Sequence, residues 1–248
     1  MESPYRTALV TGASTGIGER LVERLTAKGM TVHAVARDAA KLNALAESTG
    51  AVPHPIDLAD TEAVESEISG LDIDVLANIA GVSRMGNILS STRDDVDDLV
   101  QINLGAVLHL VRLTLPGMVE RNRGHIVNIS SIAGHYNFFG HTAYHATKAA
   151  VHQLSRQIRN DVLGKRIRVT EISPGRVETE IFARNLGGSQ EAIAEAQKTY
   201  FDGYESLTKD NVVDSIEFAL DAPQHVNLGL IEIMPTFQVP GGLTFDRH

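Results

Sequence analysis

A tyrosine and a lysine stand four positions apart in the segment YHATK, residues 144–148. On a helix this spacing places both side chains on one face. A phenol can give or take a proton, but its ordinary pKa of about 10 is too high for a base at neutral pH. An ammonium one turn away lowers the pKa of Tyr144 in a partly dry site. We therefore interpret Tyr144 and Lys148 as a proton-transfer pair for a substrate that exchanges a hydride.

Two serines precede this pair at the end of a predicted strand. Ser131 lies thirteen residues before Tyr144, and its hydroxyl can hold a substrate oxygen by a hydrogen bond that strengthens as charge develops. Ser130 is the neighbouring candidate, but side chains alternate along a strand, so only one of the two faces the pocket. We choose Ser131.

A glycine-rich turn near the N-terminus predicts a phosphate site. The segment TGASTGIG, residues 11–18, follows one apolar run and opens a helical pattern. Its glycines allow a tight turn, and the helix N-terminus supplies amides and a positive dipole end. The alternative is a purely structural strand-to-helix turn. We expect cofactor contacts from Gly12, Ser14, Thr15, Gly16, Ile17 and Gly18.

The end of the second predicted strand distinguishes the two nicotinamide dinucleotides. A carboxylate there would bind a ribose 2′-hydroxyl, but the position holds Ala36. Arg37, next in the chain, can bind a 2′-phosphate, which favours NADP over NAD. In the alternative reading, Arg37 is a solvated arginine paired with Asp38 or another acid.

The elements that must position these residues alternate along the chain, which predicts a doubly wound α/β domain spanning residues 1–248. The runs at 73–81, 125–131, 167–175 and 230–235 have the composition of strands buried on both faces. The other predicted strands are 7–12, 31–37 and 51–57, and the predicted helices are 16–28, 38–48, 60–69, 92–120, 142–163 and 209–221.

The residues that follow the predicted strands suit a ligand. In parallel sheets, ligands bind beyond the carboxyl ends of the strands. Asp57 and Leu58 follow the third strand and can hold and cover an adenine ring. The other cofactor candidates at strand ends are Asn78, Ala80 and Gly81 after the fourth strand, and Pro174, Gly175, Val177 and Thr179 after the sixth.

The segment 176–208 interrupts this alternation and is too long for an ordinary connection. It contains a Gly-Gly pair, a helical patch at 189–200, and the large apolar or aromatic residues Phe182, Leu186, Tyr200, Phe201 and Tyr204. We expect a lid over the substrate pocket; the alternative is a surface helical hairpin.

Composition excludes several classes of protein. The 248 residues carry a formal net charge of -9 and no cysteine, so nucleic-acid binding, disulfides and thiolate chemistry are not expected. We find no signal segment and expect no window apolar enough to span a bilayer. The expectation is a soluble cytoplasmic protein that acts on a small molecule.

A histidine pair, an acidic run and two apolar helices are interpreted as structural features. His141 and His145 have the i, i+4 spacing of a metal pair, but no third ligand is evident, so we predict no metal. The acidic run 92–100 fits a helix start capped by Thr92. The apolar helices at 92–120 and 142–163 suggest a dimer seam, or alternatively a deeper core.

Together the segments TGASTGIG, NIAG, ISSIAG, YHATK and SPGRVET resemble the short-chain dehydrogenase/reductase family over nearly the whole chain. The resemblance implies a Rossmann fold with a seven-stranded, mostly parallel sheet and helices on both faces. It also implies a nicotinamide cofactor and the catalytic set Ser131, Tyr144, Lys148 and Asn103. In the family, that asparagine holds a helix kink and a water that relays protons from the lysine.

Two positions refine this resemblance. Thr179 matches the family position that binds the nicotinamide carboxamide. Ile79 departs from the pattern, because the family often has a second asparagine there; we expect the backbone to fulfil the role.

A finer likeness concerns the segments LPGMVERNRGHIVNISSIAG and HVNLGLIEIMPTFQ, which resemble the branch of NADP-dependent 3-hydroxy acid and serine dehydrogenases. This implies NADP and a homotetramer, with a homodimer as the alternative, and leaves the substrate open. Arg84, Arg176 and Arg184 are candidates to meet an acidic substrate or are surface arginines. Phe138, Phe139 and Met85 suggest an apolar pocket wall.

We predict an NADP(H)-dependent oxidoreductase that interconverts a secondary alcohol and a carbonyl. One alternative is a protein that senses NADP(H) without turnover, although such a protein does not need the catalytic set. A second alternative is nonredox chemistry on the same fold, whose sugar-nucleotide enzymes usually carry a larger C-terminal region.

Overall fold

The computed structural model describes residues 4–84, 86–179, 181, 189–203 and 205–239. Its centre is a seven-stranded sheet of order β3-β2-β1-β4-β5-β6-β7, in which every neighbouring pair is parallel. The predicted doubly wound fold is therefore confirmed. The strands are β1 (Thr7–Thr11), β2 (Thr31–Ala36), β3 (Val52–Pro55), β4 (Val75–Asn78), β5 (Gly124–Ile129), β6 (Ile167–Pro174) and β7 (Leu230–Ile233).

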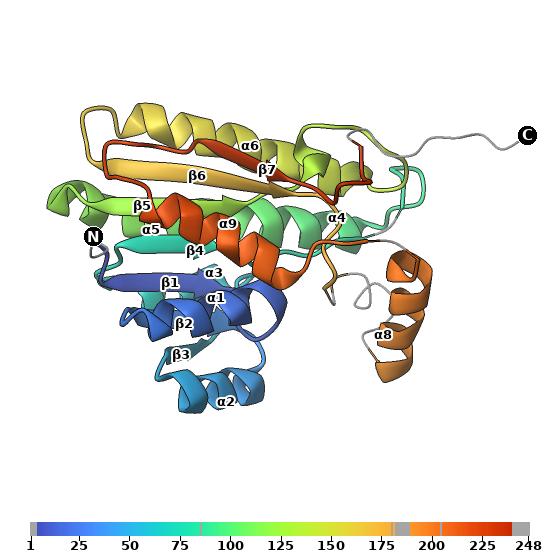
Figure 1. Ribbon diagram of the computed structural model, residues 1–248, viewed down its shortest axis with the longest axis horizontal. Coiled ribbons are helices and arrows are strands. Elements are labelled where there is room, and N and C mark those ends of the chain that lie inside the picture. The colour runs from blue at the N-terminus through green and yellow to red at the C-terminus, as the bar shows by residue number, and fades with distance from the viewer. Residues whose placement is uncertain (1–3, 85, 180, 182–188, 204, 240–248) are drawn as a thin grey trace, which may run out of the picture.

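Helices cover both faces of this sheet (Figure 1). Alternation along the strands builds a core on each face: in β1, Ala8 and Val10 pack on one side and Leu9 on the other. One face is covered by α1 (Gly16–Ala27), α2 (Ala39–Thr49) and α9 (Lys209–Asp221), and the other by α3 (Thr61–Ile68), α5 (Ala106–Arg121) and α6 (Thr142–Asp161).

The last strand differs from its prediction. Residues of β4 and β6 are buried throughout, as expected. In contrast, β7 pairs only with β6 at the edge of the sheet, and Leu230 is 46% exposed. The prediction that the run 230–235 is buried on both faces is wrong, because an apolar run does not distinguish a central strand from an edge strand.

The predicted helix at 92–120 is one helical run with a widened turn inside it. It begins with α4 (Arg93–Val100), where Thr92 and Asp95 form a reciprocal capping box, so the acidic run does stabilise a helix start. A π-helical turn at Gln101–Gly105 then leads into α5. This turn carries Asn103, which is buried.

The same run corrects an expectation about membranes. By length and composition alone, Arg93–Arg121 is apolar enough to cross a bilayer, whereas we expected no such segment. In this fold α5 packs against α3, β4 and β5, and core helices of water-soluble proteins meet the same criterion.

The segment 176–208 is described in part. Its predicted helical patch is confirmed as α8 (Gln190–Ala196) followed by a π-helical turn at Gln197–Phe201. Figure 1 shows α8 standing apart from the sheet, beyond the ends of the strands. Phe182, Leu186 and Tyr204, which we expected in a lid, lie outside the described residues.

Candidate active site

The glycine-rich turn after β1 has the geometry of an anion site. Gly12 has a φ of 67°, and a Cβ on it would lie 3.0 Å from Cα of Ala80. A Cβ on Gly18 would lie 2.3 Å from the carbonyl oxygen of Gly12. Only glycine permits this close packing. Helix α1 begins at Gly16 within this turn, and its N-cap residue Thr15 makes no side-chain cap hydrogen bond.

A cavity of ≈ 600 Å³ opens beside this turn. It brings Ser14, Thr15 and Gly16 together with Thr179, although more than 160 positions separate them in the chain. A Cβ on Gly16 would lie 4.0 Å from Cγ2 of Thr179. The remaining lining residues are Glu19, Glu23, Lys41, Ala44, Leu45, Ser48, Glu178 and Lys209.

Arg37 lies just beyond the end of β2, and its side chain is 66% exposed. Its Nη1 is 3.9 Å from Oδ2 of Asp57, whereas Asp38 caps α2 by accepting the backbone N–H of Lys41 at 3.1 Å. A loose ion pair in water is weak. The guanidinium is therefore held only weakly by Asp57. Leu58, the predicted adenine cover, is buried.

The segment after β4 lies directly against the predicted catalytic residues. A Cβ on Gly81 would lie 3.3 Å from Oδ1 of Asn103 and 3.5 Å from Nζ of Lys148. Asn103 accepts the backbone N–H of Val82 at 2.8 Å and donates to its carbonyl at 2.9 Å. The π-helical turn therefore anchors this segment through Asn103.

The backbone at the departing position Ile79 is fixed by the first strand. Oγ1 of Thr11 accepts the backbone N–H groups of Ile79 and Ala80, both at 3.0 Å. The side chain of Asn78 donates to Asn128, its neighbour on β5, at 2.8 Å. The backbone at this strand end is therefore held in place by Thr11.

The two adjacent serines point in different directions. Ser131 caps the short 3-10 turn Ile132–Gly134, where its Oγ accepts the N–H of Ala133 at 3.1 Å. The Tyr144 hydroxyl is hydrogen-bonded to Ser131. Ser130 is buried and donates to the carboxylate of Glu171. The structure thus brings Ser131, not Ser130, to Tyr144.

Lys148 lies beside the tyrosine, as the spacing predicts, but it does not lower the pKa of the phenol. Its Nζ is 5.6 Å from the centre of the Tyr144 ring and donates to the carbonyl of Ile129 at 3.0 Å. Burial raises the pKa of Tyr144 to about 12, and the hydrogen bond from Ser131 opposes this rise. Burial lowers the pKa of Lys148 to about 8, against the opposing charge of Glu171. Desolvation outweighs the attraction between the pair that we expected to dominate.

A buried polar cluster behind Ser131 was missed by sequence reasoning. Glu171 of β6 is 1% exposed and accepts hydrogen bonds from His135 at 2.9 Å and His152 at 2.7 Å, in addition to Ser130. One signal was available: a glutamate inside the buried run IRVTEIS requires partners. The sequence around Glu171 does not show that Ser130, His135 and His152 are its partners, because they lie 19 or more positions away.

The end of β6 carries the predicted segment Pro174–Thr179. The N–H of Gly175 donates to the carbonyl of Ile233 at 2.7 Å, and a Cβ on Gly175 would lie 2.3 Å from Oε1 of Gln238. Val177 is buried and bridges to Leu207. The C-terminal segment therefore passes close behind this part of the site.

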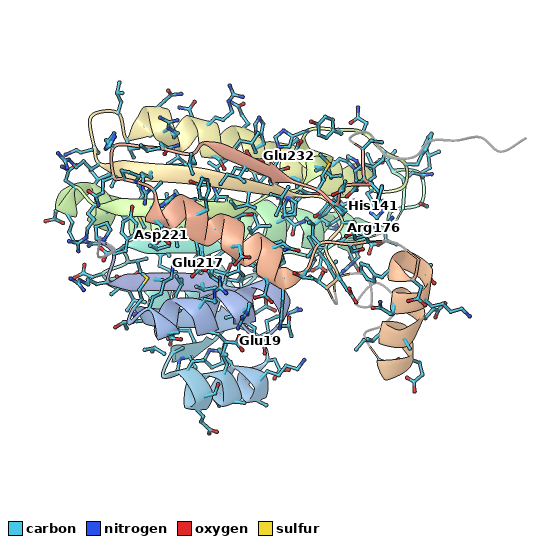
Figure 2. All side chains as sticks on the ribbon, viewed as in Figure 1. Glu19, His141, Arg176, Glu217, Asp221 and Glu232 are labelled. Atoms are coloured by element: carbon cyan, nitrogen blue, oxygen red, sulfur yellow. The ribbon has the colours of Figure 1, made fainter. Side chains whose placement is uncertain are left out.

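The side chains proposed to meet the substrate have different surroundings. Arg84 is ion-paired with Asp98 at 2.5 Å and with Asp95 at 3.6 Å. Arg176 lies beyond the end of β6, on the same side of the molecule as His141 (Figure 2). Phe139 is 85% exposed, and Arg184 and Met85 lie outside the described residues.

The histidine pair at 141 and 145 is not arranged as a metal site. Nδ1 of His145 donates to the carbonyl of His141 at 2.7 Å, and its Nε2 accepts the N–H of Phe138 at 3.3 Å. Both ring nitrogens of His145 are therefore occupied.

Comparison with known proteins adds to this geometry. Residues 6–187 match the family described as short chain dehydrogenase. The chain is 39% identical to the uncharacterized short-chain type dehydrogenase/reductase y4eK of Sinorhizobium fredii, covering 98% of this chain and 96% of the relative. It is 36% identical to the NADP-dependent 3-hydroxy acid dehydrogenase YdfG of Salmonella typhi, covering 96% and 98%. The solved closed form of serine dehydrogenase complexed with NADP+ superimposes with a TM-score of 0.91 at 34% identity, covering 98% and 100%.

Proposed function

This chain belongs to the short-chain dehydrogenase family, and we propose that it transfers a hydride between NADP(H) and a small 3-hydroxy acid or the matching carbonyl compound. The observation that carries the proposal is the contact of Tyr144 with Ser131, with Lys148 beside it, at the carboxyl edge of the sheet.

The chain offers a fitting place for the dinucleotide. Gly12 packs closely against Ala80, just beyond β4, and α1 begins within the same glycine-rich turn. We propose that this turn holds the pyrophosphate, that Arg37 binds the 2′-phosphate, and that Asp57 and Leu58 hold the adenine. We also propose that Lys148 binds ribose hydroxyls and that Thr179 binds the carboxamide. When bound, NADPH supplies the hydride.

The protein's own groups handle the proton and the substrate oxygen. With a pKa of about 12, Tyr144 is a neutral phenol at pH 7, which is the form that can protonate an alkoxide as a carbonyl is reduced. Ser131 supports the same oxygen by a hydrogen bond. For the reverse reaction, the positive charge of the oxidised cofactor would favour the phenolate. Asn103 holds the segment 81–82 against this set.

The substrate class rests on the relatives and on charge. YdfG is named a 3-hydroxy acid dehydrogenase and the solved relative a serine dehydrogenase, and serine is itself a 3-hydroxy acid. Such substrates carry a carboxylate. We propose that Arg176, which follows the carboxyl end of β6, meets the carboxylate and that the segment 176–208 closes over it as a lid.

A substrate panel tests this proposal. Purified protein is assayed with NADP+ against serine and other 3-hydroxy acids, and against neutral secondary alcohols of equal size. We expect turnover of the acids, and we expect Arg176→Met to raise their KM by about 10-fold or more, because a charge-assisted hydrogen bond is lost. The KM of any neutral substrate should not change. Tight NADPH binding without turnover across the panel would instead support a sensor.

The cofactor preference is tested separately. Arg37→Ala should weaken NADPH binding by about 10- to 100-fold, because one charge-assisted contact is lost, and leave NADH binding nearly unchanged. Equal losses for both dinucleotides would refute the role of Arg37.

We also propose that the chain works in the cytoplasm as a homotetramer or homodimer. Exposed apolar side chains support assembly: Val100 and Leu108 on the α4–α5 run are each 46% exposed, and Phe218 on α9 is 66% exposed. Light scattering after size exclusion measures the mass, and a monomer would contradict this proposal.

A further inference from the structure

Glu171 is a buried carboxylate with an unusual set of partners. Ser130 comes from the end of β5, His135 from the turn that follows the 3-10 helix, and His152 from α6. An ionised carboxylate only accepts hydrogen bonds, so each of these groups donates to it. No arginine or lysine contacts it within the described part of the chain. Glu171 therefore joins three separate elements to β6.

These elements carry the reacting groups. Ser130 directly precedes Ser131, and His135 follows the turn that Ser131 caps, so Glu171 holds that turn at both of its ends. His152 lies one helical turn beyond Lys148 on α6. The carboxylate thus fixes the Ser131 turn against the helix that carries Tyr144 and Lys148.

The same carboxylate acts on the buried ammonium. Lys148 is 4% exposed, and the carbonyl of Ile129 accepts its hydrogen bond. Burial lowers the pKa of Lys148, and the charge of Glu171 is the cause that raises it again. Titratable groups in this region of the described structure include Tyr144, whose ring centre is 5.6 Å from Nζ of Lys148, and the two imidazoles, whose ring centres are 4.3 Å apart. Tyr136, next to His135 in the chain, donates to Glu232 of β7 at 3.4 Å.

From this arrangement we propose that Glu171 is a positioning residue of the active site: it clamps the Ser131 turn to α6 and supplies the counter-charge for Lys148. It touches neither the substrate nor the cofactor in the arrangement proposed above. The expected effects on kcat rest on the proposed function. The effect of Glu171 on the charge of Lys148 does not, because it can be measured without a substrate.

The first test removes the charge and keeps the shape. In Glu171→Gln we expect kcat to fall about 10-fold, because the turn is held less firmly, with little change in NADPH binding. If protonated Lys148 is required, activity declines as pH rises through its pKa. Without the nearby anion, this alkaline decline should move to lower pH by about one unit. Glu171→Asp keeps the charge and should restore the position of the decline.

A second variant separates clamp from charge. His152→Leu removes one arm of the clamp and leaves the carboxylate, so kcat should fall while the alkaline decline stays in place. Asp74→Asn is the matched control, since Asp74 is also a buried carboxylate, 2% exposed, at the opposite end of the sheet. It should lower stability and leave the pH profile unmoved.

The pKa of Lys148 can also be read without turnover, from the pH titration of its Nζ signal in lysine-labelled protein by NMR. A lower pKa of Lys148 in Glu171→Gln than in the wild type supports the counter-charge even if no substrate is found. This measurement can therefore fail while the proposed function holds, and the proposed function can fail while this measurement holds. An unmoved signal and an unmoved alkaline decline would overturn the counter-charge. A second result would also overturn the counter-charge: a chelator abolishes wild-type activity and zinc restores it, whereas zinc restores no activity to His152→Leu. The cluster of Glu171, His135 and His152 would then hold a metal.

Discussion

The two ends of the sheet treat buried charge differently. At the amino end, Asp74 accepts the backbone N–H of Arg6 at 2.7 Å and pairs with Arg123 at 3.0 Å. Arg168, 3% exposed, donates to the Tyr5 hydroxyl and to three carbonyls at the C-terminal end of α9. Each of these buried charges meets an opposite charge or a set of backbone dipoles.

At the carboxyl end, buried charge is compensated less completely. Lys148 is held by one carbonyl, and its pKa falls to about 8. Tyr144 has a pKa of about 12 with Ser131 as its partner. Glu171 is met by imidazoles and a hydroxyl instead of an arginine. The comparison shows that the buried charges at the amino end are paired more completely, whereas at the carboxyl end burial shifts the pKa of both Tyr144 and Lys148.

The largest effect is expected from a substitution at the carboxyl end. Tyr144→Phe should lower kcat by about 10³-fold or more, because general acid catalysis contributes on that scale. Stability should hold or rise slightly, since a buried hydroxyl is removed. Stopped-flow assays with the best substrate and NADPH fluorescence titration measure the two quantities. A kcat within 10-fold of the wild type would contradict the assignment of Tyr144 at the carboxyl end as the proton donor.

A substitution at the amino end should show the reverse pattern. Asp74→Ala leaves Arg123 and two backbone amides without their acceptor, so unfolding should cost about 3–5 kcal/mol less. The kcat of the folded fraction should not change. Asp72→Ala is the control. The Asp72 side chain is 86% exposed and pairs with Arg121 at 2.7 Å, so this substitution should lower the free energy of unfolding by less than about 1 kcal/mol. Urea unfolding measures the free energy of unfolding of both variants. Equal decreases for Asp74→Ala and Asp72→Ala would contradict the claim that the buried carboxylate contributes more to stability.

Lys148→Met sharpens the comparison through pH. The folded pKa of about 8 lies below the unfolded value of 10.5, so the folded state bears the cost of a buried charge below pH 8. Allowing for the lost bond to Ile129, the variant should be more stable by about 2 kcal/mol at pH 7. Between pH 8 and 10.5 the unfolded chain binds more protons, so wild-type stability rises and the gain disappears. A gain that persists at pH 11 would disprove this origin.

The smallest effect is expected at a site that belongs to neither end. Thr92→Ala removes the capping box of α4, which should cost about 1 kcal/mol. Turnover should not change, because the π-helical turn that holds Asn103 is anchored by Val82 and Thr147. Thermal unfolding with an activity assay checks both statements; a large loss of kcat would show that the cap helps to position Asn103.

Much of the fold was predictable because its signals are local. Alternating apolar runs and helical periodicity gave the seven strands and the helices that link them, with boundaries that agree within a few residues. The status of β7 was not predictable in this way, since an edge is a property of the whole sheet. The π-helical turn at Gln101–Gly105 also lacked a local signal, because its residues continue the helical pattern.

The sequence by itself determined which groups are present and which share a helix face: Tyr144 and Lys148 at one turn, Ser131 at a strand end, and glycines where the backbone must approach. These features follow from spacing and from the geometry of regular elements. Only the tertiary structure decided the electrostatics, because desolvation and pairing depend on neighbours far apart in the chain. The raised pKa of Tyr144, the choice of Asp57 as the partner of Arg37, and the meeting of His135, His152 and Glu171 all arise in that way.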